Sequence, residues 1–280
     1  MTYSLVARDS ETGELGVAVQ SRSFGTGAAV PWALSGVGAV ATQSFTLRSY
    51  GPRGLELMEA GAAPDEALAR LVEEDDLREF RQVALLDARG ETAAHTGAEC
   101  IAEIGRVAGV GYSAQGNMLR SDGVLGALAQ GFDEARGSLA DRLLAGLDAA
   151  EIAGGDFRGR EAGAILVVPG EATATNRYDR VADVRVDNHP DPLGELRRLL
   201  EHSQALRSLR RAAPESIEQA VDTARAAGVD DDVARWVAAV SLSASEPELA
   251  ETFLAPLTAA DDRWRTAFLT ASEAVRRTDA

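Results

Sequence analysis

The second residue of the chain combines two groups that nucleophilic catalysis needs. An initiator methionine is normally removed when the next residue is small, and Thr2 is small. Removal of Met1 would leave Thr2 with a free α-amine and a hydroxyl, which are a base and a nucleophile within reach of each other. Because a free α-amine titrates near ~8, part of it is neutral and accepts protons at physiological pH. The sequence therefore predicts an N-terminal threonine nucleophile; the alternative is a threonine that merely begins a strand.

Polar residues stand close to Thr2 along its own predicted strand, or at the ends of other elements. Ser4 lies two positions along the strand, so it shares a sheet face with Thr2 and would line the site or pack. The guanidinium of Arg22 would lower the pKa of the α-amine or bind a carboxylate, unless it is a sheet-edge arginine. Asp156, in a glycine-bounded loop, would pair with the ammonium of Thr2 or with an arginine. The candidate catalytic residues are thus Thr2, Arg22 and Asp156.

The candidates for substrate binding also lie at the ends of apolar runs. Backbone N–H groups around Gln43 end a strand and would hold an oxyanion, or else cap a helix. The amides of Gln115 and Asn117 follow an apolar run, where they would orient a substrate or form a turn. The candidate substrate-binding residues are Ser4, Ser21, Ser23, Gln43, Ser44, Gln115, Asn117 and Arg160.

Composition argues against several classes of function. The net charge of −16 disfavours a nucleic-acid partner, and all 28 basic residues are arginine, which excludes chemistry that needs a lysine side chain. Cys100 has no histidine nearby in the sequence, so a thiol nucleophile is disfavoured. The three histidines lack the spacing of metal ligands. Because no glycine-rich phosphate-binding motif is present either, we predict no metal and no other cofactor.

The same sequence indicates a cytoplasmic protein. Its start lacks a charged leader followed by an apolar segment, which predicts no signal peptide. No window approaches the ~20 apolar residues of a membrane span, so we expect no membrane partner. A single cysteine forms no internal disulfide, which fits a reducing compartment.

Turn residues and hydrophobic periodicity divide the first 190 or so residues into strands and paired helices. The predicted strands cover residues 2–8, 14–21, 36–43, 81–87, 91–96, 107–115, 164–168 and 180–186. The predicted helix pairs cover 55–72, broken at 62–65, and then 120–135 and 138–153. Direct hairpins imply antiparallel pairing. Two such sheets face to face, with helices outside, give a four-layer αββα arrangement of the α+β class.

From about residue 193 the pattern becomes entirely helical. Apolar stripes predict amphipathic helices of about 12–18 residues, which two helical hairpins would bury. We place the domain boundary between residues 1–209 and residues 210–280. The second domain has no catalytic cluster, so we interpret it as a structural, oligomerisation or ligand-docking module and expect a homo-oligomer.

Several segments resemble the bacterial and archaeal family known as domain of unknown function 1028. The matching segments, in order along about the first 200 residues, are 2–9, 12–19, 36–43, 50–55, 111–119, 154–156 and 189–193. The resemblance implies an N-terminal nucleophile (Ntn) hydrolase-like fold and amide hydrolysis. Some members carry a C-terminal segment described as peptidoglycan-binding, and the helical tail here is similar in position. Proteasome-type sites in the wider Ntn group use a lysine, where this chain offers only Arg22 nearby.

Together these features predict an amidohydrolase that acts through Thr2 on a small amide, ureido or peptide-like substrate. The competing hypothesis is a non-catalytic scaffold that binds a small ligand or a peptidoglycan fragment through its helical tail. A metallohydrolase is disfavoured because the histidines are scattered.

Overall fold

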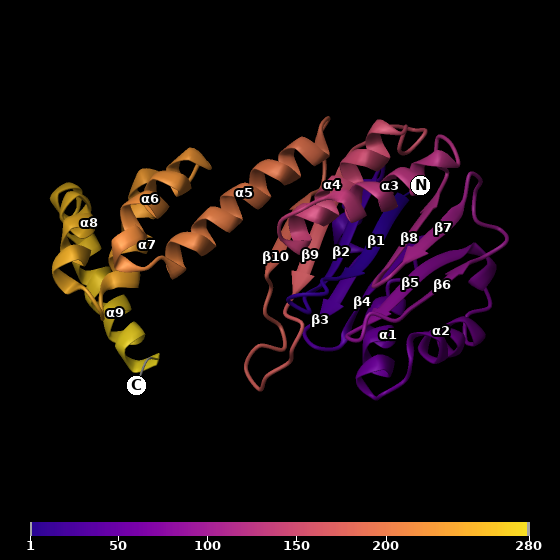
Figure 1. Cartoon of the computed structure of the whole chain (residues 1–280), viewed down its shortest axis with the longest axis horizontal. Coiled ribbons are helices and arrows are strands. Elements are labelled where there is room, and N and C mark those ends of the chain that lie inside the picture. The colour runs from indigo at the N-terminus through magenta and orange to yellow at the C-terminus, as the bar shows by residue number, and fades with distance from the viewer. Residues whose placement is uncertain (1, 279–280) are drawn as a thin grey trace. The chain divides into compact units, whose positions relative to one another are not determined.

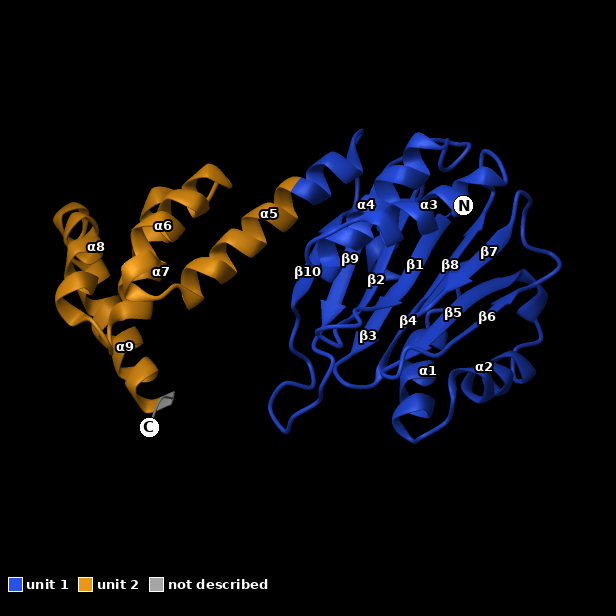
Figure 2. Ribbon diagram, viewed as in Figure 1, with its two compact units in different colours: residues 1–197 blue, residues 198–280 orange. Residues whose placement is uncertain are grey.

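The computed structural model describes residues 2–278, which form two compact units that divide between Arg197 and Arg198 (Figure 2). Helix α5 (Pro192–Arg211) runs through this division. The boundary expected between residues 209 and 210 falls near the end of the same helix and stays a prediction. Within the described residues, no helix combines the length and apolar character needed to cross a membrane.

Unit 1 is built on two sheets in which every paired strand is antiparallel (Figure 1). The six-stranded sheet has the order β10-β9-β2-β1-β8-β7, and the four-stranded sheet has the order β3-β4-β5-β6. The strands are β1 (Thr2–Arg8), β2 (Leu15–Ser21), β3 (Pro31–Leu34), β4 (Gly38–Ser44), β5 (Arg81–Asp87), β6 (Thr92–Thr96), β7 (Gly105–Gly109), β8 (Tyr112–Asn117), β9 (Ala162–Val168) and β10 (Ala182–Val186).

Two helix pairs cover the outer faces of these sheets. Helices α1 (Tyr50–Glu59) and α2 (Pro64–Glu73) pack on the four-stranded sheet, where helix and strand side chains share one buried cluster. Helices α3 (Gly123–Glu134) and α4 (Leu139–Ile152) cover the six-stranded sheet (Figure 1). The predicted α+β class with antiparallel sheets is therefore confirmed.

The layer between the two sheets changes character along β1. Toward the end of β1 it is apolar, with Val6 and Val17 packed against Ala84 and Leu86 of the other sheet. Each fully buried valine or leucine of this kind contributes about 1.5–3 kcal/mol to folding. Toward Thr2, at the start of β1, hydroxyl and amide side chains take the place of the aliphatic ones. The sandwich thus has an apolar end and a polar end.

Two strand predictions were wrong in detail. The run 107–115, predicted as one strand, is a hairpin of β7 and β8, because the chain turns at Gly109–Gly111. Gly111 has a left-handed φ of 73°, and the side chain of Val110 between the glycines is fully exposed. Strand β3 was not predicted. It is only four residues long and includes a proline, which suits a sheet edge.

Unit 2 is helical, as the apolar stripes predicted. It contains the later part of α5 and the helices α6 (Ile217–Ala226), α7 (Asp231–Leu242), α8 (Pro247–Ala260) and α9 (Arg263–Thr278). Leu209, Val221 and Leu254 lie in its core. At the start of α7 the Asp230 carboxylate accepts hydrogen bonds from two backbone N–H groups, which caps the helix.

Candidate functional site

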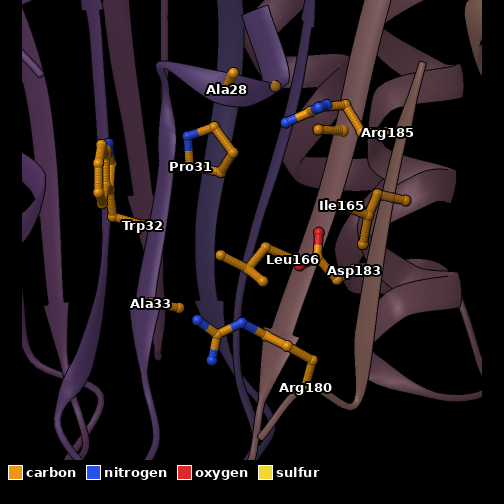
Figure 3. Close-up of a pocket in the computed structure, with 11 residues that line it drawn as sticks. Ala28, Pro31, Trp32, Ala33, Ile165, Leu166, Arg180, Asp183 and Arg185 are labelled. Carbon is orange, nitrogen blue, oxygen red and sulfur yellow. The ribbon is translucent and has the colours of Figure 1, made fainter. Parts of the chain in front are cut away.

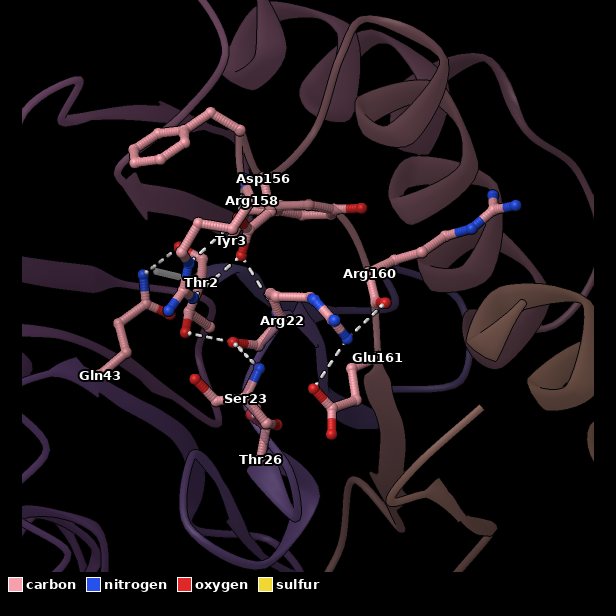
Figure 4. A network of polar contacts seen from close by, with 12 residues as sticks. Thr2, Tyr3, Arg22, Ser23, Thr26, Gln43, Asp156, Arg158, Arg160 and Glu161 are labelled. Atoms are coloured by element: carbon pink, nitrogen blue, oxygen red, sulfur yellow. Dashed lines mark hydrogen bonds and ion pairs between the residues drawn. The ribbon is translucent and has the colours of Figure 1, made fainter. Parts of the chain in front are cut away.

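Thr2 begins β1, an inner strand of the six-stranded sheet, and lies between two polar neighbours. In register it stands opposite Ser21 of β2 and Asn117 of β8, so all three side chains face the four-stranded sheet. The Thr2 hydroxyl donates a hydrogen bond to Ser21 Oγ at 3.1 Å, and Ser21 Oγ also accepts one from the Ser23 backbone N–H at 3.1 Å. Thr2 is only 7% exposed. Figure 4 shows this group from close by.

Gln43 joins Thr2 to the opposite sheet. Its Nε2 donates to the Thr2 backbone carbonyl at 3.1 Å (Figure 4). Its Oε1 accepts from the Ser4 hydroxyl at 2.7 Å. Ser4 and Gln43 are both fully buried. A buried amide is stable only when it is hydrogen-bonded. The bonds of the Gln43 amide therefore hold the start of β1 against the four-stranded sheet.

Gln82 is the centre of this polar layer and was missed by the sequence analysis. Its Oε1 accepts from Gln43 Nε2 at 2.7 Å and from Asn117 Nδ2 at 3.0 Å, and its own Nε2 donates to the Gly116 carbonyl at 2.9 Å. Gln82 has no exposed surface. The sequence feature that would have identified it is a glutamine that directly precedes the apolar run 83–86 within the same predicted strand.

Gln115 lies within strand β8, and Ser44 is the last residue of strand β4. Gln115 Nε2 donates across the layer to the Ala41 carbonyl at 2.9 Å, while its Oε1 has no partner among the described residues. Ser44 has a left-handed φ of 68° at the end of β4, and helix α1 begins only at Tyr50. Ser44 therefore does not cap that helix, which was the alternative considered from the sequence.

Asp156 lies near Thr2 but is paired with an arginine. Its Oδ2 accepts from the Arg22 backbone N–H at 3.0 Å and forms an ion pair with Arg158 at 3.1 Å. A second bond runs from the Arg158 backbone N–H to Oδ1 at 2.8 Å. The carboxylate is buried, and these donors offset the cost of removing its charge from water. Of the two partners expected for Asp156, the structure provides the arginine.

The guanidinium of Arg22 is turned away from Thr2 and binds a carboxylate, which is the second alternative in the sequence analysis. It is half-exposed and forms an ion pair with Glu161 at 2.9 Å, turned toward Arg160 (Figure 4). Arg160 donates in turn to the Pro190 carbonyl at 3.0 Å. The side chains of Arg22 and Arg160 are bound by Glu161 and by backbone carbonyls. Arg22 therefore contacts Asp156 through its backbone N–H and not through its side chain.

Tyr3 anchors the other face of the same strand. Its hydroxyl donates to Glu151 Oε2 of α4 at 2.9 Å. Burial, and next the charge and hydrogen bond of Glu151, raise the pKa of Tyr3 well above its ordinary value. Tyr3 is therefore neutral at physiological pH and holds the start of β1 against the helix layer.

A cavity of about 290 Å³ opens elsewhere, between β3 and the strands β9 and β10 (Figure 3). Trp32, Leu166, Arg180, Asp183 and Arg185 line it, and it includes none of the candidate residues. Within residues 2–278, no three histidine, cysteine or acidic side chains are grouped so that they would hold a metal ion.

One family model and two solved structures are similar to this chain. A family model described as "Family of unknown function (DUF1028)" matches residues 2–196. The crystal structure of protein SPO2555 from Silicibacter pomeroyi, of the same family, is 32% identical. It covers 72% of this chain and 86% of its own, with a TM-score of 0.67. Anbu (ancestral beta-subunit) from Yersinia bercovieri is 12% identical over 75% of this chain and 97% of its own, with a TM-score of 0.35. No curated protein matches the chain.

Proposed function

This chain belongs to the DUF1028 family of unknown function, and we propose that it is an N-terminal nucleophile amidohydrolase acting on a small amide, ureido or peptide-like substrate. The proposal includes an Ntn-hydrolase-like fold for unit 1. Two antiparallel sheets face to face between helix pairs support it. The observation that carries the chemistry is the Thr2 hydroxyl at the start of β1, which is held by Ser21 while Gln43 binds the Thr2 carbonyl.

The proposed reaction requires removal of Met1, which lies outside the described residues. The freed α-amine of Thr2 accepts the proton of the Thr2 hydroxyl as Oγ bonds to the substrate carbonyl carbon. The C–N bond then breaks, and the leaving nitrogen takes that proton. Water attacks the resulting ester, and Oγ recovers a proton as the carboxylic acid product departs.

Asn117 is the side-chain donor that we assign to the oxyanion. It stands directly opposite Thr2 in register and faces the same layer. One hydrogen of its Nδ2 is committed to Gln82 Oε1 at 3.0 Å, and the second has no partner among residues 2–278. Loss of a single oxyanion donor typically costs about 10²–10³ in kcat.

A hydrolysis screen tests the proposal. Wild-type protein, Thr2→Ala and Thr2→Ser are incubated with N-acyl and ureido compounds, and release of the amine is measured. Thr2→Ala should lose several powers of ten in rate, as expected for an essential nucleophile. Thr2→Ser should keep measurable activity, since it retains both a hydroxyl and an α-amine. Full activity in Thr2→Ala would exclude Thr2 as the nucleophile.

A further inference from the structure

Three phenylalanine side chains are strongly exposed in the described residues, out of seven in the sequence. They are Phe24 at 73%, Phe45 at 54% and Phe157 at 44% exposure. Each of them lies within three residues of a residue that bonds to Thr2, or bonds to the residue that follows Asn117. Exposed aromatic side chains that gather at one place on a soluble protein usually mark a binding surface.

Each of the first two phenylalanines comes shortly after a residue that bonds to Thr2, which is Ser21 for Phe24 and Gln43 for Phe45. Phe24 follows Ser23, whose backbone N–H donates to the same Ser21 Oγ that accepts the Thr2 hydroxyl. Phe45 lies two residues after Gln43, and it packs edge-to-face on Phe80 with 5.6 Å between ring centroids. This aromatic pair holds Phe45 in place at the end of β4.

The third phenylalanine belongs to the segment next to Asn117. The Phe157 backbone N–H donates to the carbonyl of Met118, the residue after Asn117, at 3.4 Å. The Met118 N–H donates to the carbonyl of Ile101, which is 47% exposed. Phe24, Phe45, Ile101 and Phe157 therefore lie on segments at the Thr2 end of the sandwich, and we call these four exposed side chains the apolar rim.

A cation is fixed beside this rim. Arg120 Nη2 donates to the Phe157 carbonyl at 3.0 Å, and none of the described carboxylates is paired with it. The other arginines near Thr2 differ in this respect, because Arg22 pairs with Glu161 and Arg158 pairs with Asp156. In a chain with a net charge of −16, an arginine without a carboxylate partner next to an aromatic rim favours an anionic ligand with an apolar group.

We propose that the substrate is an N-acyl amino acid with an aromatic acyl group. This proposal rests on the proposed function. The aromatic ring packs among the side chains of the apolar rim, the scissile carbonyl lies over the Thr2 hydroxyl, and the carboxylate pairs with Arg120. Hydrolysis breaks the amide C–N bond and adds water, so an arylalkanoic acid and a free amino acid leave.

Calorimetric binding to the Thr2→Ala variant tests the ligand class without turnover. The probes are N-phenylacetylglycine, N-acetylglycine and the uncharged N-phenylacetylglycinamide. Burial of the phenyl ring should make the first bind about tenfold tighter than the second, or more. The carboxylate should make the first bind several-fold tighter than the third, and Arg120→Gln should remove that difference.

The rim is tested by adding Phe45→Ala or Phe157→Ala to Thr2→Ala. Each should weaken N-phenylacetylglycine binding by about tenfold and leave N-acetylglycine binding unchanged, because only the ring contact is lost. Val110→Ala is the control, since it removes an exposed apolar side chain at the turn whose Gly111 carbonyl binds the Arg8 N–H, at the other end of β1. Val110→Ala should leave the binding of both N-phenylacetylglycine and N-acetylglycine unchanged.

Three results would overturn the inference. They are no measurable binding of N-phenylacetylglycine, equal binding of the phenylacetyl and acetyl probes, or conversion of a dimer to a monomer by the rim variants with unchanged binding. The last result, seen by sedimentation, would make the rim an interface between copies. If rim-dependent binding occurs but the wild type hydrolyses none of the probes, the proposed function fails and the ligand class stands. If the wild type hydrolyses both acyl probes at equal rates, the proposed function stands and the ligand class fails.

Discussion

The two ends of strand β1 bury polar groups by different means. Between the sheets at the Thr2 end, the buried side chains are neutral hydroxyls and amides that bond to one another, while the charged Asp156 lies in a neighbouring loop. At the other end they are charged. The Asp9 carboxylate accepts from the backbone N–H groups of Glu11 and Thr12 at 2.9 and 2.8 Å and pairs with Arg142 at 3.3 Å.

The difference separates a structural arrangement from one suited to chemistry. The Asp9 end is a turn in which both carboxylate oxygens have partners within the fold. The Thr2 end has donor and acceptor positions to spare, since Gln115 Oε1 and one hydrogen of Asn117 Nδ2 lack partners within residues 2–278. A neutral, incompletely paired layer binds a polar substrate without first breaking an ion pair.

Removal of the Gln82 side chain should have the largest effect on the polar end of the sandwich, and the effect is a loss of stability. Gln82→Ala leaves the amides of Gln43 and Asn117 and the Gly116 carbonyl without their partner, and we expect the free energy of unfolding to fall by about 3 kcal/mol. Urea unfolding measures this loss. Gln130→Ala, in which an exposed helix glutamine loses its bond to Glu134, should cost about 0.5 kcal/mol or less. Equal losses in the two variants would show that the buried layer has no special role.

The hydroxyl of Ser21 distinguishes chemistry from packing at the same end. Ser21→Ala removes the acceptor that orients the Thr2 hydroxyl, so kcat should fall by about 10- to 100-fold. Steady-state kinetics on a substrate from the screen measures the fall. Ser113→Ala alters an equally buried serine that faces the same layer opposite Val6 and should leave kcat unchanged. A normal rate in Ser21→Ala would contradict the role given to Ser21.

The Asp9 end should affect stability alone, and by the smallest amount. Burial would raise the pKa of Asp9, but hydrogen bonds from Thr12 and Glu11 and the charge of Arg142 outweigh it, so this pKa is lowered. A lowered folded-state pKa stabilises the fold above the ordinary value near ~3.9, and this contribution is lost as pH falls through the folded-state pKa.

Asp9→Asn should therefore reduce the free energy of unfolding by about 1–2 kcal/mol at pH 7. The gap between wild type and variant should narrow below pH ~4, where the wild-type carboxylate also loses its charge. Urea unfolding at the two pH values measures both differences, and kcat should not change. A constant difference at both pH values would show that ionisation of Asp9 is not what stabilises the turn.

The fold was largely predictable because its signals are local. The strand over residues 81–87 has the predicted bounds, since Asp87 and Gly90 mark the turn and the run before them is apolar. The β7–β8 hairpin was missed because Val110 makes residues 107–115 read as a continuous apolar strand. Its exposure in a glycine-flanked turn is a tertiary fact that hydrophobicity does not encode.

The candidate site was predictable only where strand ends determine it. Thr2, Ser21 and Asn117 meet because antiparallel register places the start of β1 beside the ends of its neighbours. Gln82 depends on the register between β4 and β5 and on how one sheet faces the other, which one sequence does not specify. The direction of Arg22 depends on Glu161, 139 residues away in the chain. The catalytic and substrate-binding roles of the candidate residues stay predictions.

The mass of the purified protein, before and after reaction with a β-lactone, tests the central claim most directly. We predict a mass one methionine residue below that of the full sequence. A single covalent addition should follow, and peptide mapping should locate it on Thr2. Ser21→Ala should react more slowly, because its Thr2 hydroxyl is no longer held. Retention of Met1, or an adduct on any residue other than Thr2, would contradict the claim that Thr2 is an N-terminal nucleophile.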